Sequence, residues 1–327
     1  MNAAKKPLVA ALCGGVGGAK LALGLQYATP EAELAVIVNT GDDFEHLGLT
    51  ICPDLDTVMY TLAGVSDTQR GWGRAGESWA FMDALRALGG DDWFRLGDRD
   101  LATHVLRTEA LRAGHTLSEI TRDLATALAV RARIMPMSDD PVRTVITSDD
   151  GDLSFQRYFV KLAAAPRVRR IRFSDADAAA APGGVLEVLE SARLAAVVVC
   201  PSNPFLSIDP ILGIAGIRER LVQTAAPVTA VSPIVGGAAV KGPTAKIMTE
   251  LGVPVTNVAI AEHYGDLVDG LVIDRADAAE RADIEALGIA VHVTDTLMHT
   301  DADKARLAAD TLAFAARCRA RRHMAAS

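Results

Sequence analysis

A short apolar run that passes directly into a glycine-rich segment is the feature that most constrains this chain. The run is "LVAALC" (8–13), and "GGVGGAK" (14–20) follows it before a helical pattern begins. An apolar run of this length, ended by glycines, is typical of a strand buried in a parallel sheet. The sequence therefore predicts a strand–loop–helix unit at the start of the chain.

Apolar runs and helical patterns alternate along most of the remaining sequence. We expect further strands at 34–40, 168–174, 194–202, 227–235, 270–274 and 289–294, and helices near 18–28 and at 54–65, 77–88, 98–113, 116–129 and 301–322. This alternation favours an α/β fold with a doubly wound, mostly parallel, Rossmann-like sheet. Because no repeat or linker divides the chain, we interpret residues 1–327 as a single α/β domain.

The segment at roughly 66–160 is richer in helical patterns and ends in "VRTVITSDDGDLSFQRYFV" (142–160). Two alternating runs about a "DDGD" turn are typical of a β-hairpin. We therefore expect an inserted, mainly helical lobe that carries this hairpin over the sheet.

Composition excludes several classes of protein. A net charge of −8 argues against general binding of nucleic acid or anionic membranes, so a polyanionic ligand needs a local basic pocket. No apolar stretch has the length of a transmembrane helix. The four cysteines lie far apart in the sequence, which predicts reduced thiols and a cytoplasmic protein.

The glycine-rich segment suits a phosphate or diphosphate. Glycines let backbone N–H groups approach an anion, and the start of the next helix adds partial positive charge. The candidate residues are Gly14, Gly15, Gly17, Gly18 and Lys20. Lys20 stands where a dinucleotide fingerprint needs its third glycine, and no Ser or Thr follows it as in a Walker A loop. The alternative is a tight turn whose glycines only permit close packing.

Four aspartates follow the second predicted strand, at positions 42, 43, 54 and 56. Carboxylates beside a phosphate loop repel the ligand unless a cation lies between them, and Mg²⁺ is the natural one. Asp42 has an alternative role in stabilising a turn. Asp54 has one in complementing the positive N-terminus of the predicted helix at 54–65. We therefore favour Asp43 and Asp56 as the functional pair.

Other strand ends and the predicted lobe supply weaker candidates. Ser202 and Asn203 follow a strand, where an amide can read a base or ribose, although an Asn-Pro turn explains them equally well. Lys241 and Lys246 flank a predicted helix start and could bind a second phosphate. The alternative is that both are solvated surface residues. Arg95 either faces a ligand or pairs with an aspartate nearby.

Taken in order, these motifs resemble the 2-phospho-L-lactate transferase family. The resemblance runs from residue 14 to residue 298 and rests on "GGVGGAK", "NTGDD", "ICPDLDTVMYTLAG", "LGDRDLATH", "MSDDPVRT", "PSNPFLSIDPIL", "SPIVGGAAVKGP" and "DTLM". Each motif alone is weak, but their succession is specific.

The resemblance implies a Mg²⁺-dependent transferase of coenzyme F-420 biosynthesis. Such an enzyme moves a phospholactyl, phosphoenolpyruvyl or phosphoglyceryl group from its guanosine diphosphate conjugate to the ribityl hydroxyl of the deazaflavin Fo. The products are F-420-0, or its dehydro form, and GMP. The resemblance also implies small-molecule substrates and a homodimer. The net charge and the lack of a stretch of transmembrane length predict no nucleic-acid or membrane partner.

The resemblance assigns roles to residues of this chain. The glycine-rich segment would hold the diphosphate. Asp43 and Asp56 would be the catalytic carboxylates and the Mg²⁺ ligands, and Asp56 and Arg95 would contact Fo. The nucleotide loop would contain Ser202, Asn203 and Pro204.

Two other functions remain open from the sequence. One is a non-catalytic regulator of the same fold that binds a nucleotide sugar, similar to the gluconeogenesis-factor proteins. The other is an NAD-dependent oxidoreductase that uses the first strand–helix–strand unit, although the missing third glycine argues against it.

Overall fold

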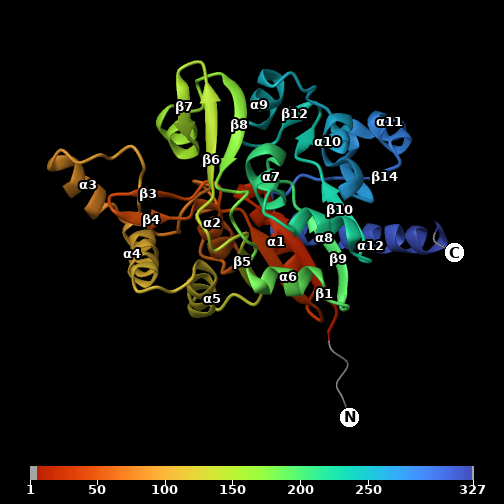
Figure 1. The fold of residues 1–327 in the computed structure, drawn as a ribbon, viewed down its shortest axis with the longest axis horizontal. Coiled ribbons are helices and arrows are strands. Elements are labelled where there is room, and N and C mark those ends of the chain that lie inside the picture. Colours follow the sequence, from red (N-terminus) through yellow and green to blue (C-terminus); the bar gives the residue numbers. More distant parts are fainter. Residues whose placement is uncertain (1–5, 326–327) are drawn as a thin grey trace, which may run out of the picture.

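A seven-stranded sheet forms the centre of the protein, whose computed structural model describes residues 6–325 (Figure 1). All neighbouring strands in it are parallel, which confirms the predicted doubly wound α/β sheet. The strands lie in the order β14 (Ala290–Thr294), β13 (Gly270–Asp274), β10 (Val228–Val231), β9 (Leu194–Val199), β1 (Leu8–Cys13), β2 (Glu33–Val38) and β5 (Arg133–Pro136).

The strand order reverses between β1 and β9. From β1 the chain builds outward through β2 and β5, and from β9 it builds outward through β10, β13 and β14. In sheets of this kind, ligands bind outside the carboxyl ends of the strands at this switch point. The glycine-rich segment follows β1, and the segment with Ser202 follows β9, so both lie at this edge.

Helices cover both faces of the sheet (Figure 1). One face packs against α1 (Gly15–Ala28), α2 (Pro53–Leu62), α5 (Leu117–Ala127) and α12 (Asp301–Ala325). The other face packs against α6 (Gly183–Leu189), α8 (Ile217–Gln223), α9 (Thr244–Glu250), α10 (Asn257–Tyr264) and α11 (Arg281–Ala286). Within residues 6–325, no helix combines the length and the apolar composition that crossing a bilayer requires.

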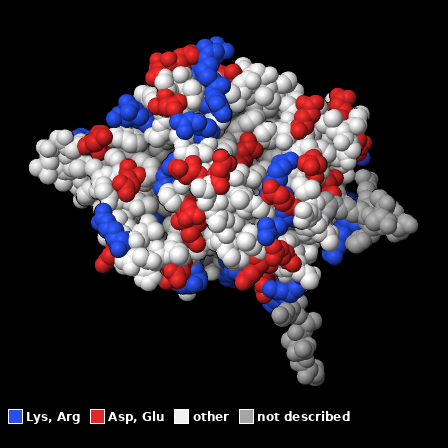
Figure 2. Space-filling model, viewed as in Figure 1, with Lys and Arg blue, Asp and Glu red and all other residues white. Residues whose placement is uncertain are grey.

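A small antiparallel sheet lies beside the central one, in the order β7 (Gly151–Ser154), β6 (Arg143–Ser148) and β8 (Val168–Ser174). The predicted hairpin is confirmed as β6 and β7. The strand predicted at 168–174 exists, but it pairs antiparallel with β6 instead of joining the parallel sheet. Its arginines explain this, because strands inside a parallel sheet are almost wholly apolar. In Figure 2, basic and acidic side chains are interspersed over this small sheet.

Strand β5 (Arg133–Pro136) was not predicted, and it lies inside the segment expected as an inserted lobe. Helices α3 (Ala80–Ala87) and α4 (Asp98–Arg112) therefore precede a strand of the central sheet, and the hairpin follows it. The lobe's boundary at 66–160 stays a prediction. A separate apolar cluster of Ile51, Met82 and Leu96 packs between α3, α4 and the short strands β3 (Phe44–His46) and β4 (Leu49–Ile51).

Candidate active site

Hydrogen bonds join three segments at the carboxyl edge of the sheet. The Gly14 backbone N–H donates to Ser202 Oγ at 3.0 Å, and the Ser202 hydroxyl donates to the Gly14 carbonyl at 2.8 Å. The next N–H, that of Gly15, donates to Asp54 Oδ1 at 2.6 Å. The turns after β1 and β9 and the start of α2 therefore form one connected unit.

Close contacts explain why several positions of the first turn of α1 are glycine. A Cβ atom on Gly14 would lie 2.5 Å from Asp54 Oδ2, and one on Gly17 would lie 2.5 Å from the carbonyl oxygen of Pro201. A Cβ on Gly18 would collide with Ser202 Oγ. Gly15 instead has a φ of +62°, which favours glycine. Close packing thus accounts for three of these glycines, and their contact with a phosphate stays a prediction.

Three buried carboxyl groups lie beside this unit, and we call Asp42, Asp43 and Asp54 the acidic group. Burial raises the pKa of Asp54 to about 6, against the opposing effect of hydrogen bonds from Asn39 and Gly15. Burial raises the pKa of Asp43 to about 7, although Arg143 lowers it. Burial and the charges of its two neighbours hold the pKa of Asp42 well above its ordinary range. Protons or a cation must therefore balance this group.

Asn39 links the acidic group to the loop after β9. Its amide Nδ2 lies 2.9 Å from Asp54 Oδ2, 3.3 Å from Asp42 Oδ1 and 3.3 Å from the Leu206 carbonyl. Its Oδ1 accepts the N–H of Gly41 at 2.8 Å. Sequence reasoning missed this residue, although it opens the "NTGDD" motif that drew attention to the aspartates.

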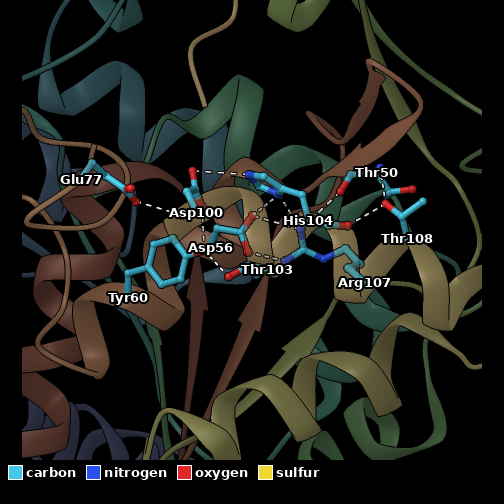
Figure 3. Close-up of polar contacts among 9 residues, drawn as sticks. All are labelled: Thr50, Asp56, Tyr60, Glu77, Asp100, Thr103, His104, Arg107 and Thr108. Carbon is cyan, nitrogen blue, oxygen red and sulfur yellow. Dashed lines mark hydrogen bonds and ion pairs between the residues drawn. The ribbon is translucent and has the colours of Figure 1, made fainter. Parts of the chain in front are cut away.

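A second buried polar group, which we call the arginine cluster, contains Asp56, Tyr60, Asp100, Thr103, His104 and Arg107 (Figure 3). Both carboxylate oxygens of Asp56 accept hydrogen bonds from the Arg107 guanidinium, one of them at 3.1 Å. The Tyr60 hydroxyl donates to Asp100 at 2.6 Å, and His104 Nε2 lies 3.4 Å from the same carboxylate. Asp56 from α2 is thereby fixed to α4.

The two groups differ in how well they suit Mg²⁺. Ligand atoms of Asp56, Asp100 and His104 lie within 4.8 Å of one another, but Arg107 already supplies positive charge to Asp56. An imidazole is also a poor ligand for this ion. Asp43 Oδ1, in contrast, is buried and has no hydrogen-bond partner. Asp43 therefore fits a Mg²⁺ ligand, whereas Asp56 would have to share its carboxylate with Arg107.

The predicted nucleotide loop is ordered by its own asparagine. Asn203 Oδ1 accepts the N–H groups of Phe205 and Leu206, and Pro204 begins the short helix η2 (Pro204–Ile208). The Nδ2 of Asn203 is buried without a hydrogen-bond partner. Its N–H groups are therefore unused hydrogen-bond donors.

Three predicted cations lie in different surroundings. Arg95 is exposed, and its guanidinium lies 4.3 Å from the centre of the Trp79 ring; no ion pair joins it to an aspartate among the described residues. Lys20 donates to the Met298 carbonyl at 2.9 Å. Lys246 pairs with Glu250 at 2.7 Å and belongs to the packing of α9.

Comparisons with known proteins agree with the predicted family. The sequence model for 2-phospho-L-lactate transferase CofD matches residues 9–311. A phosphoenolpyruvate transferase of Streptomyces griseus is 44% identical over 319 residues, covering 95% of this chain and 99% of that protein. A 2-phospho-L-lactate transferase of Methanosarcina mazei is 38% identical over 293 residues, covering 90% of this chain and 95% of that protein.

Solved structures share the fold at lower sequence identity. A member of the UPF0052 family from Bacillus halodurans superposes with a TM-score of 0.60 at 16% identity, covering 94% of this chain and 99% of that one. This likeness bears on the fold alone. The family match over residues 9–311 and the identity of 38–44% to these two transferases show that the chain belongs to the 2-phospho-L-lactate transferase CofD family.

Proposed function

We propose that this protein transfers a phospho-three-carbon-acid group from its guanosine diphosphate conjugate to the ribityl hydroxyl of Fo, giving GMP and F-420-0 or its dehydro form. The proposal rests on family membership and, within the structure, on the buried carboxylate of Asp43. Its buried Oδ1 has no hydrogen-bond partner. Its charge acts on Asp42, which shares the Asn39 amide with Asp54, and Asp54 accepts the N–H of Gly15 in the glycine-rich turn. Such a pairing of carboxylate and anion-binding turn suits a metal-bound diphosphate.

The conjugate of phosphoenolpyruvate is the donor we favour. Bacterial relatives named phosphoenolpyruvate transferase are up to 44% identical to this chain, and the archaeal 2-phospho-L-lactate transferase is 38% identical. The difference is modest, so the assay below includes every candidate acid.

The reaction needs one bond to phosphorus to form and one to break. The ribityl oxygen of Fo bonds to the phosphorus that carries the acid, and the bond from that phosphorus to GMP breaks. The hydroxyl proton passes to a carboxylate of the acidic group. Mg²⁺, when bound, neutralises charge that develops on the phosphate oxygens.

Residues of this chain bind and orient the substrates in this proposal. Asp43 would hold Mg²⁺, and Asp56, the second ligand that the resemblance implies, would share its carboxylate between the ion and Arg107. The Nδ2 of Asn203, which has no hydrogen-bond partner, contacts the nucleotide, beside Ser202 and Pro204. Arg95, stacked over Trp79, contacts the flat ring of Fo together with Asp56.

Mass spectrometry of a defined reaction tests the proposal. Purified protein, Fo and Mg²⁺ are incubated with the guanosine diphosphate conjugates of phospholactate, phosphoenolpyruvate and 3-phosphoglycerate, one at a time. We expect a product of Fo plus one phospho-acid, together with GMP, and no product in EDTA. If no donor yields product and Fo does not bind, the proposal is wrong; tight binding of a nucleotide sugar would then favour a regulator.

A further inference from the structure

A turn formed by residues 66–74, between α2 and α3, meets the connection between β12 (Ala238–Ala239) and α9 at the carboxyl edge of the sheet. The turn is ordered by a bridge between Ser66 and Arg74 and by the Gly71 N–H, which donates to the Asp67 carbonyl at 2.8 Å. Lys241 lies in the opposing connection. A Cβ atom on Gly71 would lie only 2.6 Å from Lys241 Nζ, so the lysine packs directly on the turn.

This contact joins segments from the two halves of the sheet. The 66–74 turn follows α2, on the side of β1 and β2, whereas Lys241 follows β10, on the other side of the switch point. Lys241 also lies near Lys20 of α1, because its charge contributes to lowering the Lys20 pKa. Lys241 therefore lies between the helix that begins in the glycine-rich segment and the part of the chain that carries Trp79.

Lys241 differs from the other lysines around it in having no partner. Lys20 donates to the Met298 carbonyl, and Lys304 pairs with Asp301 at 2.7 Å. The exposed Lys241 has neither a hydrogen bond nor an ion pair among the residues that the structure describes. Two further cations are also engaged: Arg107 is paired with Asp56, and the charge of Arg143 lowers the Asp43 pKa. Lys241 is thus a cation available to an anionic ligand.

We propose that Lys241, with Lys20 beside it, binds the carboxylate of the three-carbon acid in the donor, and that Gly71 leaves the space its ammonium needs. This inference rests on the proposed function. Phospholactate, phosphoenolpyruvate and 3-phosphoglycerate all carry this carboxylate, so Lys241 acts in the same way for each. The diphosphate has other partners, namely the backbone N–H groups and Mg²⁺.

The test compares two ligands that differ by the acid. The dissociation constants of GDP and of the conjugate that the wild type uses are measured by calorimetry in Mg²⁺ without Fo. Lys241→Gln should weaken binding of the conjugate by about 10-fold or more, as expected for loss of a charge-assisted hydrogen bond, and leave GDP binding within about twofold. In steady state, KM for the donor rises while kcat and KM for Fo change little.

Matched variants separate this role from a general effect of charge or backbone. Lys6→Gln makes the same change of charge at an exposed lysine before β1, at the opposite edge of the sheet, and should bind both ligands normally. Gly71→Ala displaces the ammonium of Lys241, whereas Gly73→Ala places a methyl group in open space at a similar φ, +69° against +81°. Only Gly71→Ala should weaken binding of the conjugate.

Two results would overturn the inference while leaving the proposed function intact. One is an active Lys241→Gln enzyme with an unchanged affinity for the conjugate. The other is an equal loss of affinity for GDP and conjugate, which would place Lys241 on the phosphates. If the wild type itself bound no conjugate, the proposed function would fall together with the inference.

Discussion

Asp54 caps a helix to which it does not belong: its Oδ1 accepts the N–H of Gly15, in the first turn of α1, at 2.6 Å. From the sequence, its alternative role was at the start of its own helix, α2. The positive end of α1 therefore already has a negative partner. A phosphate bound at this turn would lie beside that carboxylate, and the Mg²⁺ of the proposed function would offset the repulsion between the two negative charges.

The raised pKa of Asp54 predicts how the stability of the metal-free protein depends on pH. Burial raises this pKa from its ordinary value of 3.8 to about 6, so the folded state binds the proton more tightly than the unfolded state. The free energy of unfolding should fall as pH rises from about 4 to just above 6. At higher pH, Asp54 is ionised in both states and no longer contributes to the pH dependence. The full difference corresponds to about 3 kcal/mol.

Urea unfolding of the wild type and Asp54→Asn in EDTA, at pH 4.5 and 7.5, measures this effect. Asp42 and Asp43 titrate in both proteins, but loss of the Asp54 charge also lowers the Asp42 pKa. The smaller loss of stability expected for Asp54→Asn therefore measures the contribution of Asp54 together with its effect on Asp42. An equal pH dependence of the free energy of unfolding in the two proteins would contradict the prediction.

Local patterns in the sequence predicted the elements that depend on local interactions. The helix predicted at 116–129 begins with a capping box, in which Thr116 and Glu119 exchange hydrogen bonds of 3.2 and 3.0 Å. The long apolar runs became central strands because only apolar residues fit a strand covered on both faces. The four-residue β5 was missed because so short a run of apolar residues carries little periodicity.

The arrangement of the site depends on contacts that local patterns do not encode. Gly15 and Asp54 are 39 residues apart, and Asp56 and Arg107 are 51 residues apart. Arg107 lies in the helix predicted at 98–113, but no local pattern identifies a partner on another helix. The partner matters, because it changes how available Asp56 is to a metal ion.

Gly17 provides a test of close packing as the reason for the glycine-rich turn. Gly17→Ala places a methyl group 2.5 Å from the carbonyl oxygen of Pro201. Both the new Cβ and this oxygen are fixed by the backbone, so neither can move away by a simple side-chain rotation. We expect a loss of about 1–3 kcal/mol in the free energy of unfolding without any ligand. Gly183→Ala, in the first turn of α6 with open space around it, is the control and should be neutral or slightly stabilising. A Gly17→Ala protein as stable as the wild type would disprove the packing argument.

The buried ion pair between Asp56 and Arg107 predicts a large effect on stability. Arg107→Ala leaves the Asp56 carboxylate buried without its cation, which typically costs about 3–5 kcal/mol. Arg112→Ala, on the same helix but exposed, removes a hydrogen bond to the Gly48 carbonyl and should cost less than about 1 kcal/mol.

A double variant shows whether the charge itself is responsible. Asp56→Asn combined with Arg107→Met removes both charges, and it should be more stable than Arg107→Ala alone. Urea unfolding of all four proteins gives the comparison. A cost for Arg107→Ala no greater than that for Arg112→Ala would show that the pair contributes little.

Asp43→Asn tests the proposed centre of the site. The substitution keeps the size of the side chain and removes the charge of a buried carboxylate whose Oδ1 has no partner. We expect turnover to fall by about 100-fold or more, because a charge that acts on the reacting phosphate is lost, while Fo binding stays largely intact. We also expect Mg²⁺ to stabilise the wild type against heat and to give Asp43→Asn no such stabilisation.

The control is Asp266→Asn, which makes the same chemical change at an exposed carboxylate paired with Arg218. It should retain wild-type turnover and the wild-type response to Mg²⁺. Turnover and thermal stabilisation by Mg²⁺ are both measured, because a folding defect would lower turnover while the folded fraction still bound Mg²⁺. Near-normal turnover in Asp43→Asn would remove Asp43 from the site. A loss of turnover with the Mg²⁺ stabilisation retained would instead assign the metal to other carboxylates of the acidic group and leave Asp43 to accept the proton, which its pKa of about 7 suits.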